Sequence, residues 1–271
     1  MNSVRVLVPL DGSEMAEAAL SYVTTLRGLG PLRVRLVAVA EDPRRYGLAH
    51  PDEWQERQAH ILREYLALKQ SQFLEQHKDV EVESAVRLGY PADVLFKDAE
   101  QFQAGYVVTA THGHTGTDRW RLGSVADKII RSSEWNTLVV GPQPATWPLH
   151  HHVRSIMVPL DGSKRAEAAI PIAAAIAEER GAQVHLVRVV EKPLRIEDIT
   201  GYALAVSEDA ARAYLEETAE NFPDLAPPHL PAHRLACRRA AGVHPGPGDG
   251  SGCGHVPWLR GPVADHPRQY D

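Results

Sequence analysis

The amino-acid sequence contains one segment twice. Residues 6–20, VLVPLDGSEMAEAAL, return almost unchanged as residues 156–170, IMVPLDGSKRAEAAI, at an offset of 150. Over residues 4–20 and 154–170, ten of seventeen positions are identical. Because solenoid repeats recur every 20–50 residues or so, a period this long indicates two copies of a whole domain.

Within the first copy, strand and helix patterns alternate. Apolar and β-branched runs predict five buried strands: SVRVLVPL, LRVRLVAVA, VEVESAVRLG, GYVVTA and NTLVVG. Segments of helical period between them predict four helices, the first of them over SEMAEAALSYVTTLRGLG, residues 13–30. Five strands alternating with four helices over about 140 residues are typical of an α/β fold with a doubly wound parallel sheet.

The expected organisation is two such five-stranded, Rossmann-like domains in tandem, the second of them incomplete. We predict a complete first domain at 1–142, a linker at 143–153, a partial second domain at 154–222 and an irregular tail at 223–271. The tail holds nine of the twenty prolines and seven of the twenty glycines, without helical or alternating periodicity. We interpret the three adjacent histidines of the linker, His150 to His152, as an exposed run and not as a metal site.

Two other interpretations of the tail remain open. Four residues carry zinc-ligand chemistry, Cys237, His244, Cys253 and His255, but they lack the close cysteine pair of small zinc sites, so we expect no metal there. A frameshift near residue 235 is the second interpretation. Codons exist for residues 265–270 that, read one base later, encode a sequence resembling Ile129 to Ser133. In that case the second domain lacks its phosphate loop, fourth helix and fifth strand.

Charge and hydropathy exclude several classes of function. A net charge of -6 and a pI near 6.2 argue against general nucleic-acid binding and against binding to an anionic membrane surface. No apolar run approaches the roughly 20 residues that cross a bilayer, and the N-terminus MNSVRVLVPLDG lacks a cationic region followed by an apolar one. We therefore expect a cytoplasmic protein with neither a nucleic-acid nor a membrane partner.

The residues after the first and fourth strands carry ligand-binding chemistry, because ligands of open parallel sheets bind at the carboxyl ends of strands. Asp11 follows the first strand, where its carboxylate can accept hydrogen bonds from a ribose hydroxyl or an adenine amine. Gly12 permits the sharp turn into the next helix, for which Ser13 is the expected N-cap.

After the fourth strand comes a glycine-rich loop. Gly113 and Gly116 leave backbone N–H groups uncovered, and Gly123 with Ser124 begins a helix whose unpaired N–H groups favour an anion. Glycines followed by a helix start with a hydroxyl predict a phosphate cradle.

These landmarks resemble the universal stress protein family. The resemblance rests on VPLDGS, GYPADVL and ATHGHTGTDRWRLGSVADKIIRSS followed by TLVV, and it covers 1–141 and about 154–222. The phosphate motif of ATP-binding members is Gly, two residues, Gly, nine residues, then Gly-Ser or Gly-Thr. This chain matches it from Gly113 onward, with Ala110 in place of the first glycine. An alanine fits there if the backbone is extended and is unfavourable if φ is positive.

The resemblance implies adenine-nucleotide binding, with ATP, AMP or ADP as ligand and Mg or Mn accompanying the phosphates. It implies that Asp11 and the backbone near Val39 hold adenosine, and that Gly113, Gly116, Gly123 and Ser124 hold the phosphates. The remaining candidate binding residues adjoin these: Pro9, Leu10, Gly12, Ser13, Ala110, His114 and Val125.

We expect a nucleotide-binding regulator of the stress response and not a dedicated catalyst. The loop has no GxxxxGK[ST] sequence and no lysine before Lys128, and we interpret His112 and His114 as loop-ordering or solvent-facing residues. Two alternatives remain: a weak ATP hydrolase, or a scaffold that binds no nucleotide and dimerises. The terminal strand around Leu138 to Val140 is the expected pairing edge, either between two chains or between the two copies in one chain.

Overall fold

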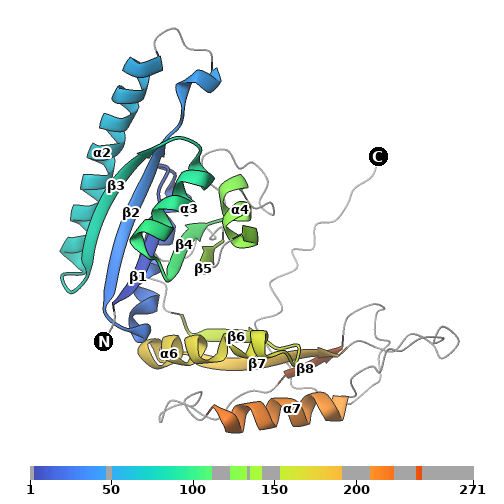
Figure 1. Ribbon diagram of the computed structural model, residues 1–271. Coiled ribbons are helices and arrows are strands. Elements are labelled where there is room, and N and C mark those ends of the chain that lie inside the picture. Colours follow the sequence, from blue (N-terminus) through green and yellow to red (C-terminus); the bar gives the residue numbers. More distant parts are fainter. Residues whose placement is uncertain are drawn as a thin grey trace, which may run out of the picture. The chain divides into compact units, whose positions relative to one another are not determined.

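The computed structural model describes residues 3–46, 51–111, 123–132, 135–141, 153–190, 208–222 and 236–239. The chain divides into two compact units, largely residues 1–153 and 154–271, which are described one at a time (Figure 1).

The first unit contains a five-stranded parallel sheet. Its strands are β1 (Val4–Pro9), β2 (Leu32–Ala40), β3 (Glu81–Leu88), β4 (Tyr106–Ala110) and β5 (Asn136–Val140). Its helices are α1 (Glu14–Ser21), α2 (Pro51–Gln76), α3 (Pro91–Phe102) and α4 (Ser124–Ser132), with short 3-10 helices η1 (Val23–Leu29) and η2 (Pro43–Tyr46). The strand order β3-β2-β1-β4-β5 confirms the doubly wound sheet. Chain order reverses between β1 and β4, which places their carboxyl ends side by side.

The single helix expected over residues 13–30 is divided in the structure. The α-helix α1 ends at Ser21, and the 3-10 helix η1 takes the chain from Val23 to Leu29. The prediction was wrong here because Val23, Thr24 and Thr25 are adjacent β-branched residues, which restrict side-chain rotamers in an α-helix.

Helices cover both faces of the sheet. The long helix α2 packs along β2 and β3, whereas α3 packs on β2 and β1 from the other face (Figure 1). The face under α3 and α4 has an apolar cluster, whose buried members are Leu7, Val37, Leu95, Ala99, Phe102, Ala104, Val107 and Ile129. This cluster fixes α3 and α4 above the strand ends that hold the predicted ligand residues.

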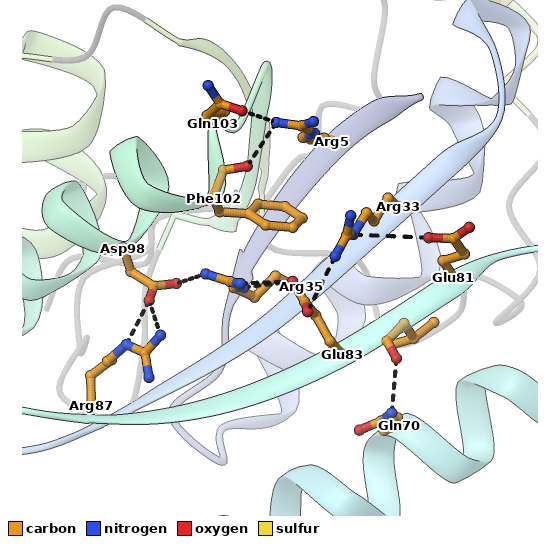
Figure 2. Close-up of polar contacts among 11 residues, drawn as sticks. Arg5, Arg33, Arg35, Gln70, Glu81, Glu83, Arg87, Asp98, Phe102 and Gln103 are labelled. Atoms are coloured by element: carbon orange, nitrogen blue, oxygen red, sulfur yellow. Dashed lines mark hydrogen bonds and ion pairs between the residues drawn. The ribbon is translucent and has the colours of Figure 1, made fainter. Parts of the chain in front are cut away.

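A charged network beside this cluster attaches α3 to the edge of the sheet (Figure 2). Asp98 of α3 is only 1% exposed, and its carboxylate lies 2.5 Å from the Arg87 guanidinium of β3 and 3.5 Å from that of Arg35 on β2. Arg35 also pairs with Glu83 at 2.8 Å and lies over the ring of Phe102, 4.4 Å from its centroid. The buried carboxylate thus joins two strands and one helix.

The second unit repeats the first half of this fold. Its strands are β6 (Ser155–Pro159), β7 (Gln183–Val190) and β8 (Ala236–Arg239), and its helices are α5 (Lys164–Glu167), α6 (Ile170–Arg180) and α7 (Glu208–Asn221). The three strands are parallel in the order β6-β7-β8, which corresponds to β1-β2-β3. Within the part of this unit that the structure describes, nothing corresponds to α3, β4, α4 or β5.

Strand β8 lies inside the segment that we expected to be an irregular tail. Its four residues, ACRR, are too short and too polar to show a strand period, so sequence reasoning passed over them. The rest of 223–271 lies outside the described residues, and with it most of the segment concerned by the frameshift hypothesis.

The second sheet exposes the face that α3 covers in the first. Leu7 on β1 is 1% exposed, whereas Met157, its counterpart on β6 at the offset of 150, is 50% exposed. Val189 on β7, the counterpart of half-buried Val39, is 59% exposed. At these two equivalent strand positions, the side chain is therefore more buried in the first unit than in the second.

This difference predicts unequal effects of two matched substitutions. Leu7→Ala should lower the free energy of unfolding of the first unit by about 2–5 kcal/mol, because it leaves a cavity in a packed core. Met157→Ala should change that of the second unit by less than about 1 kcal/mol. Native-state hydrogen exchange reports β1 and β6 separately, and equal losses in the two strands would contradict the assignment of an uncovered face.

Candidate functional site

A cavity of about 510 Å³ opens at the carboxyl edge of the first sheet. It lies where β1, β2 and β4 end and is bounded by residues of α2, α3 and α4. Eight of the sequence-predicted binding residues line it: Pro9, Leu10, Asp11, Val39, Ala110, Gly123, Ser124 and Val125. Gly113, His114 and Gly116, as well as His112, lie outside the described residues.

Gly12 and Ser13 do not line the cavity but hold Asp11 beside it. Gly12 has a φ of 82°, which turns the chain sharply after β1. The backbone N–H and the hydroxyl of Ser13 both donate to Oδ1 of Asp11, at 3.0 and 2.6 Å. Ser13 is also the N-cap of α1, because its Oγ accepts from the N–H of Ala16 at 3.1 Å. The turn thus fixes the carboxylate before any ligand arrives.

The second unit has the same turn. Gly162 has a φ of 91°, the N–H of Ser163 donates to Asp161 Oδ1 at 2.8 Å, and Ser163 caps α5 through Ala166. Hydrogen bonding to Asp161 by the side chain and then the backbone N–H of Ser163 lowers the pKa of Asp161. The Asp-Gly-Ser turn is therefore a structural element in both units, and only what surrounds it distinguishes Asp11 from Asp161.

The start of α4 forms another part of the cavity wall. The N–H of Gly123 donates to the carbonyl of Thr111 at 2.6 Å, which brings the helix start back to the carboxyl end of β4. The N–H of Asp127 donates to the carbonyl of Gly123, so Gly123 caps the helix, and the residues of its first turn line the cavity. Free N–H groups at a helix start, together with the helix dipole, attract an anion.

Ala110, which replaces the first glycine of the phosphate motif, lies in regular strand. It is the last residue of β4, pairs with Val140 of β5 and is 7% exposed. Among described residues other than glycine, Gln103 is the one with a positive φ, so Ala110 is not strained. The condition under which an alanine would be unfavourable here is not met.

Sequence reasoning missed several residues that line the cavity. The most informative are Glu41, Gln58, Tyr90, Asp93 and Lys128. Lys128 forms an ion pair with Asp93 across the space between α4 and α3. The one signal for Lys128 was its place four residues after Ser124, which puts both on one face of α4. For Gln58 the pattern of α2 contained no such signal.

Helix α2 is tied to α1 next to Asp11. The Tyr65 hydroxyl donates to Glu17 Oε1 at 3.1 Å, and Lys69 Nζ lies 2.7 Å from Oε2 of the same carboxylate. Burial raises the pKa of Tyr65, and the charge of Glu17 and its hydrogen bond raise it further. The second unit repeats the tie, since Tyr214 donates to Glu167 at 3.1 Å.

Family membership follows from comparison with known proteins. A model of the universal stress protein family matches residues 3–141 and again residues 152–245. The chain belongs to the universal stress protein family. The second match continues past α7 and takes in β8.

Individual members support this membership. The chain is 28% identical over 138 residues to universal stress protein MJ0531 of Methanocaldococcus jannaschii, a match that covers 50% of this chain and 81% of that protein. It is 30% identical over 141 residues to a universal stress protein of Mycolicibacterium smegmatis, covering 51% of this chain and 46% of that one. A solved universal stress protein of Archaeoglobus fulgidus matches with a TM-score of 0.64 over 89% of this chain and 80% of its own; at 16% identity it shows a shared fold.

In this universal stress protein, the hydrogen bond from Tyr65 to Glu17 predicts a specific loss of stability at alkaline pH. Because folding raises the pKa of Tyr65 above its unfolded value of 10.0, the neutral tyrosine stabilises the fold fully below that pH. This stabilisation is lost progressively as the pH rises above 10.0 toward the raised pKa of the folded state. Thermal unfolding at pH 8 to about 11 should therefore show a smaller alkaline loss for Tyr65→Phe than for wild type. Tyr90→Phe, at an exposed tyrosine, is the control, and equal slopes for wild type and Tyr65→Phe would contradict the prediction.

Proposed function

We propose that the first unit binds an adenine nucleotide, ATP or AMP/ADP, and that the protein acts as a nucleotide-responsive regulator in the stress response. One observation carries the proposal: a single cavity is lined both by Asp11, which follows β1, and by the first turn of α4, which returns to the end of β4. Small-molecule sites have volumes of about 300–1,000 Å³, a range that includes this cavity.

The polar groups on the two sides of the cavity differ. The carboxylates of Asp11 and Glu41 lie where β1 and β2 end, and they accept hydrogen bonds from hydroxyl and amino groups. On the α4 side, the helix start favours an anion, and Lys128 is paired with the carboxylate of Asp93, which also lines the cavity. The helix start supports one orientation, with the nucleoside against β1 and β2 and the phosphates against α4.

Lys128 is the cation that we assign to the phosphates. Its ammonium pairs with Asp93 and is about half exposed, so the pair can open at little cost.

We include Mg or Mn in the proposal only as companions of the phosphates. Within the described ranges, no cluster of three or more His, Cys, Asp or Glu side chains is arranged to hold a metal ion.

The proposal extends to assembly and location. Strand β5 pairs with β4 and forms one edge of the five-stranded sheet, so its Leu138 to Val140 segment is the surface through which we expect two domains to pair. We place the protein in the cytoplasm. The helices that the structure describes include none long and apolar enough to cross a membrane.

Calorimetry of the full chain with ATP, AMP and adenosine tests the proposal. We expect one nucleotide per chain, with ATP binding about tenfold or more tighter than adenosine, because charge-assisted hydrogen bonds to phosphate contribute about 1.5–3 kcal/mol. Equal affinity for the three ligands would contradict the assignment of a phosphate-binding site to the cavity. Failure of all three to bind would favour the scaffold alternative.

A lysine substitution tests the orientation. Lys128→Met should weaken ATP several-fold and leave adenosine nearly unchanged, because only the phosphates reach that end of the cavity. Lys97→Met, an exposed lysine of α3 outside the cavity lining, is the matched control. An equal loss of ATP and adenosine affinity would place Lys128 at the nucleoside and overturn the assigned orientation.

A further inference from the structure

Helix α2 contributes a buried polar group to the cavity that the fold itself does not use. Gln58 lines the cavity and is half-buried, and its Oε1 atom is buried without a hydrogen-bond partner in the described part of the chain. Buried side-chain oxygens are hydrogen-bonded in the great majority of structures, because an unpaired one has lost its water without replacement. The oxygen is fully covered in this structure, so a ligand in the cavity can bond to it only after the Gln58 side chain turns toward the cavity.

Gln58 lies at the nucleoside end of the cavity. It is on the first half of α2, which follows β2, and Leu62 one turn later lines the cavity from the same face of the helix. The end of β2 adds Val39 and Glu41 to this lining. Ser124 and Lys128 belong to α4, after β4, at the phosphate end.

The chemistry of an amide matches one edge of adenine. The carboxylates of Asp11 and Glu41 can only accept hydrogen bonds when ionised, whereas the Gln58 amide both donates and accepts. Adenine presents its 6-amino group directly beside a ring nitrogen that accepts. A glutamine can satisfy both at once through its oxygen and its NH2 group, in a bidentate pair. The apolar side chains of Val39 and Leu62 suit the faces of the ring.

We propose that Gln58 recognises the purine base, with its Oε1 accepting from the 6-amino group and its NH2 group donating to the adjacent ring nitrogen. This inference rests on the proposed nucleotide function and adds a specificity-determining residue to it. It also explains why an amide is present among the charged and apolar residues on this side of the cavity.

Two ligands that differ by one group test the contact. AMP and purine riboside 5′-monophosphate are identical except for the 6-amino group, which the second lacks. Calorimetry of the full-length wild type should show AMP binding more tightly by roughly 5- to 150-fold, the value of one good bidentate pair. Gln58→Leu should bind both ligands alike. Gln72→Leu, at an exposed glutamine near the other end of α2, should keep the wild-type preference.

The outcomes separate the two levels of the proposal. If wild type binds neither ligand, the nucleotide function is overturned and the role of Gln58 with it. If wild type prefers AMP and Gln58→Leu keeps the full preference, only the role of Gln58 is overturned.

A second variant covers the case in which Gln58→Leu does not fold, as judged by circular dichroism. The carboxylate of Gln58→Glu still accepts from the 6-amino group but cannot donate to the ring nitrogen. It should bind AMP several-fold more weakly than wild type and still prefer AMP to purine riboside 5′-monophosphate. AMP binding as tight as that of wild type would overturn the bidentate contact.

Discussion

The packing of α3 on the face of β1 and β2 is the contact on which the rest of the first unit depends. Leu7 and Val37 from the strands and Leu95 and Phe102 from the helix share one buried cluster. The Asp98 carboxylate reinforces it by joining α3 to β2 and β3 through two arginines. Since α3 begins at Pro91, this packing also fixes Tyr90 and Asp93 at the cavity. Apolar burial thus positions one wall of the proposed site.

The two units show that an identical turn does not make an identical site. The Asp-Gly-Ser turn has the same left-handed glycine, the same hydrogen bond to the aspartate and the same serine cap in both. The end of β4 and the start of α4 line the same cavity as Asp11. In the described part of the second unit no counterpart of either element is present, and Met157 is exposed where Leu7 is buried. We therefore assign the binding role to Asp11 and a structural role to Asp161.

The sequence predicted most of the fold because strand and helix periods are local properties. The repeat and the five apolar runs were sufficient for the parallel sheet, and the strand-end rule brought Asp11 and Ser124 to one edge. Val39 was named only through the family resemblance. Strand β8 escaped prediction because four residues carry no period and depend on pairing with β7. The 3-10 helix η1 was missed because the helical period was extended through the β-branched residues Val23, Thr24 and Thr25.

The cavity residues that sequence reasoning missed were missed for a different reason. Gln58 and Lys128 sit on helices whose rotation about their own axes is set by tertiary packing, so the sequence does not say which polar side chains face inward. Gln58 is surrounded along α2 by other polar residues, and only the three-dimensional structure distinguishes it, through a buried side-chain oxygen that has no hydrogen-bond partner among the described residues. Ala110 is the converse case, in which a departure from the family motif became acceptable once its strand conformation was known.

The most direct test of the account is a crystal structure of the full chain with AMP. We predict one nucleotide in the first unit, with the base between Val39 and Gln58, the ribose near Asp11 and the phosphate at the first turn of α4. A nucleotide in the reverse orientation would contradict the anion-binding role assigned to the start of α4. A nucleotide held by the second unit instead would contradict the central claim that only the first copy completes the site.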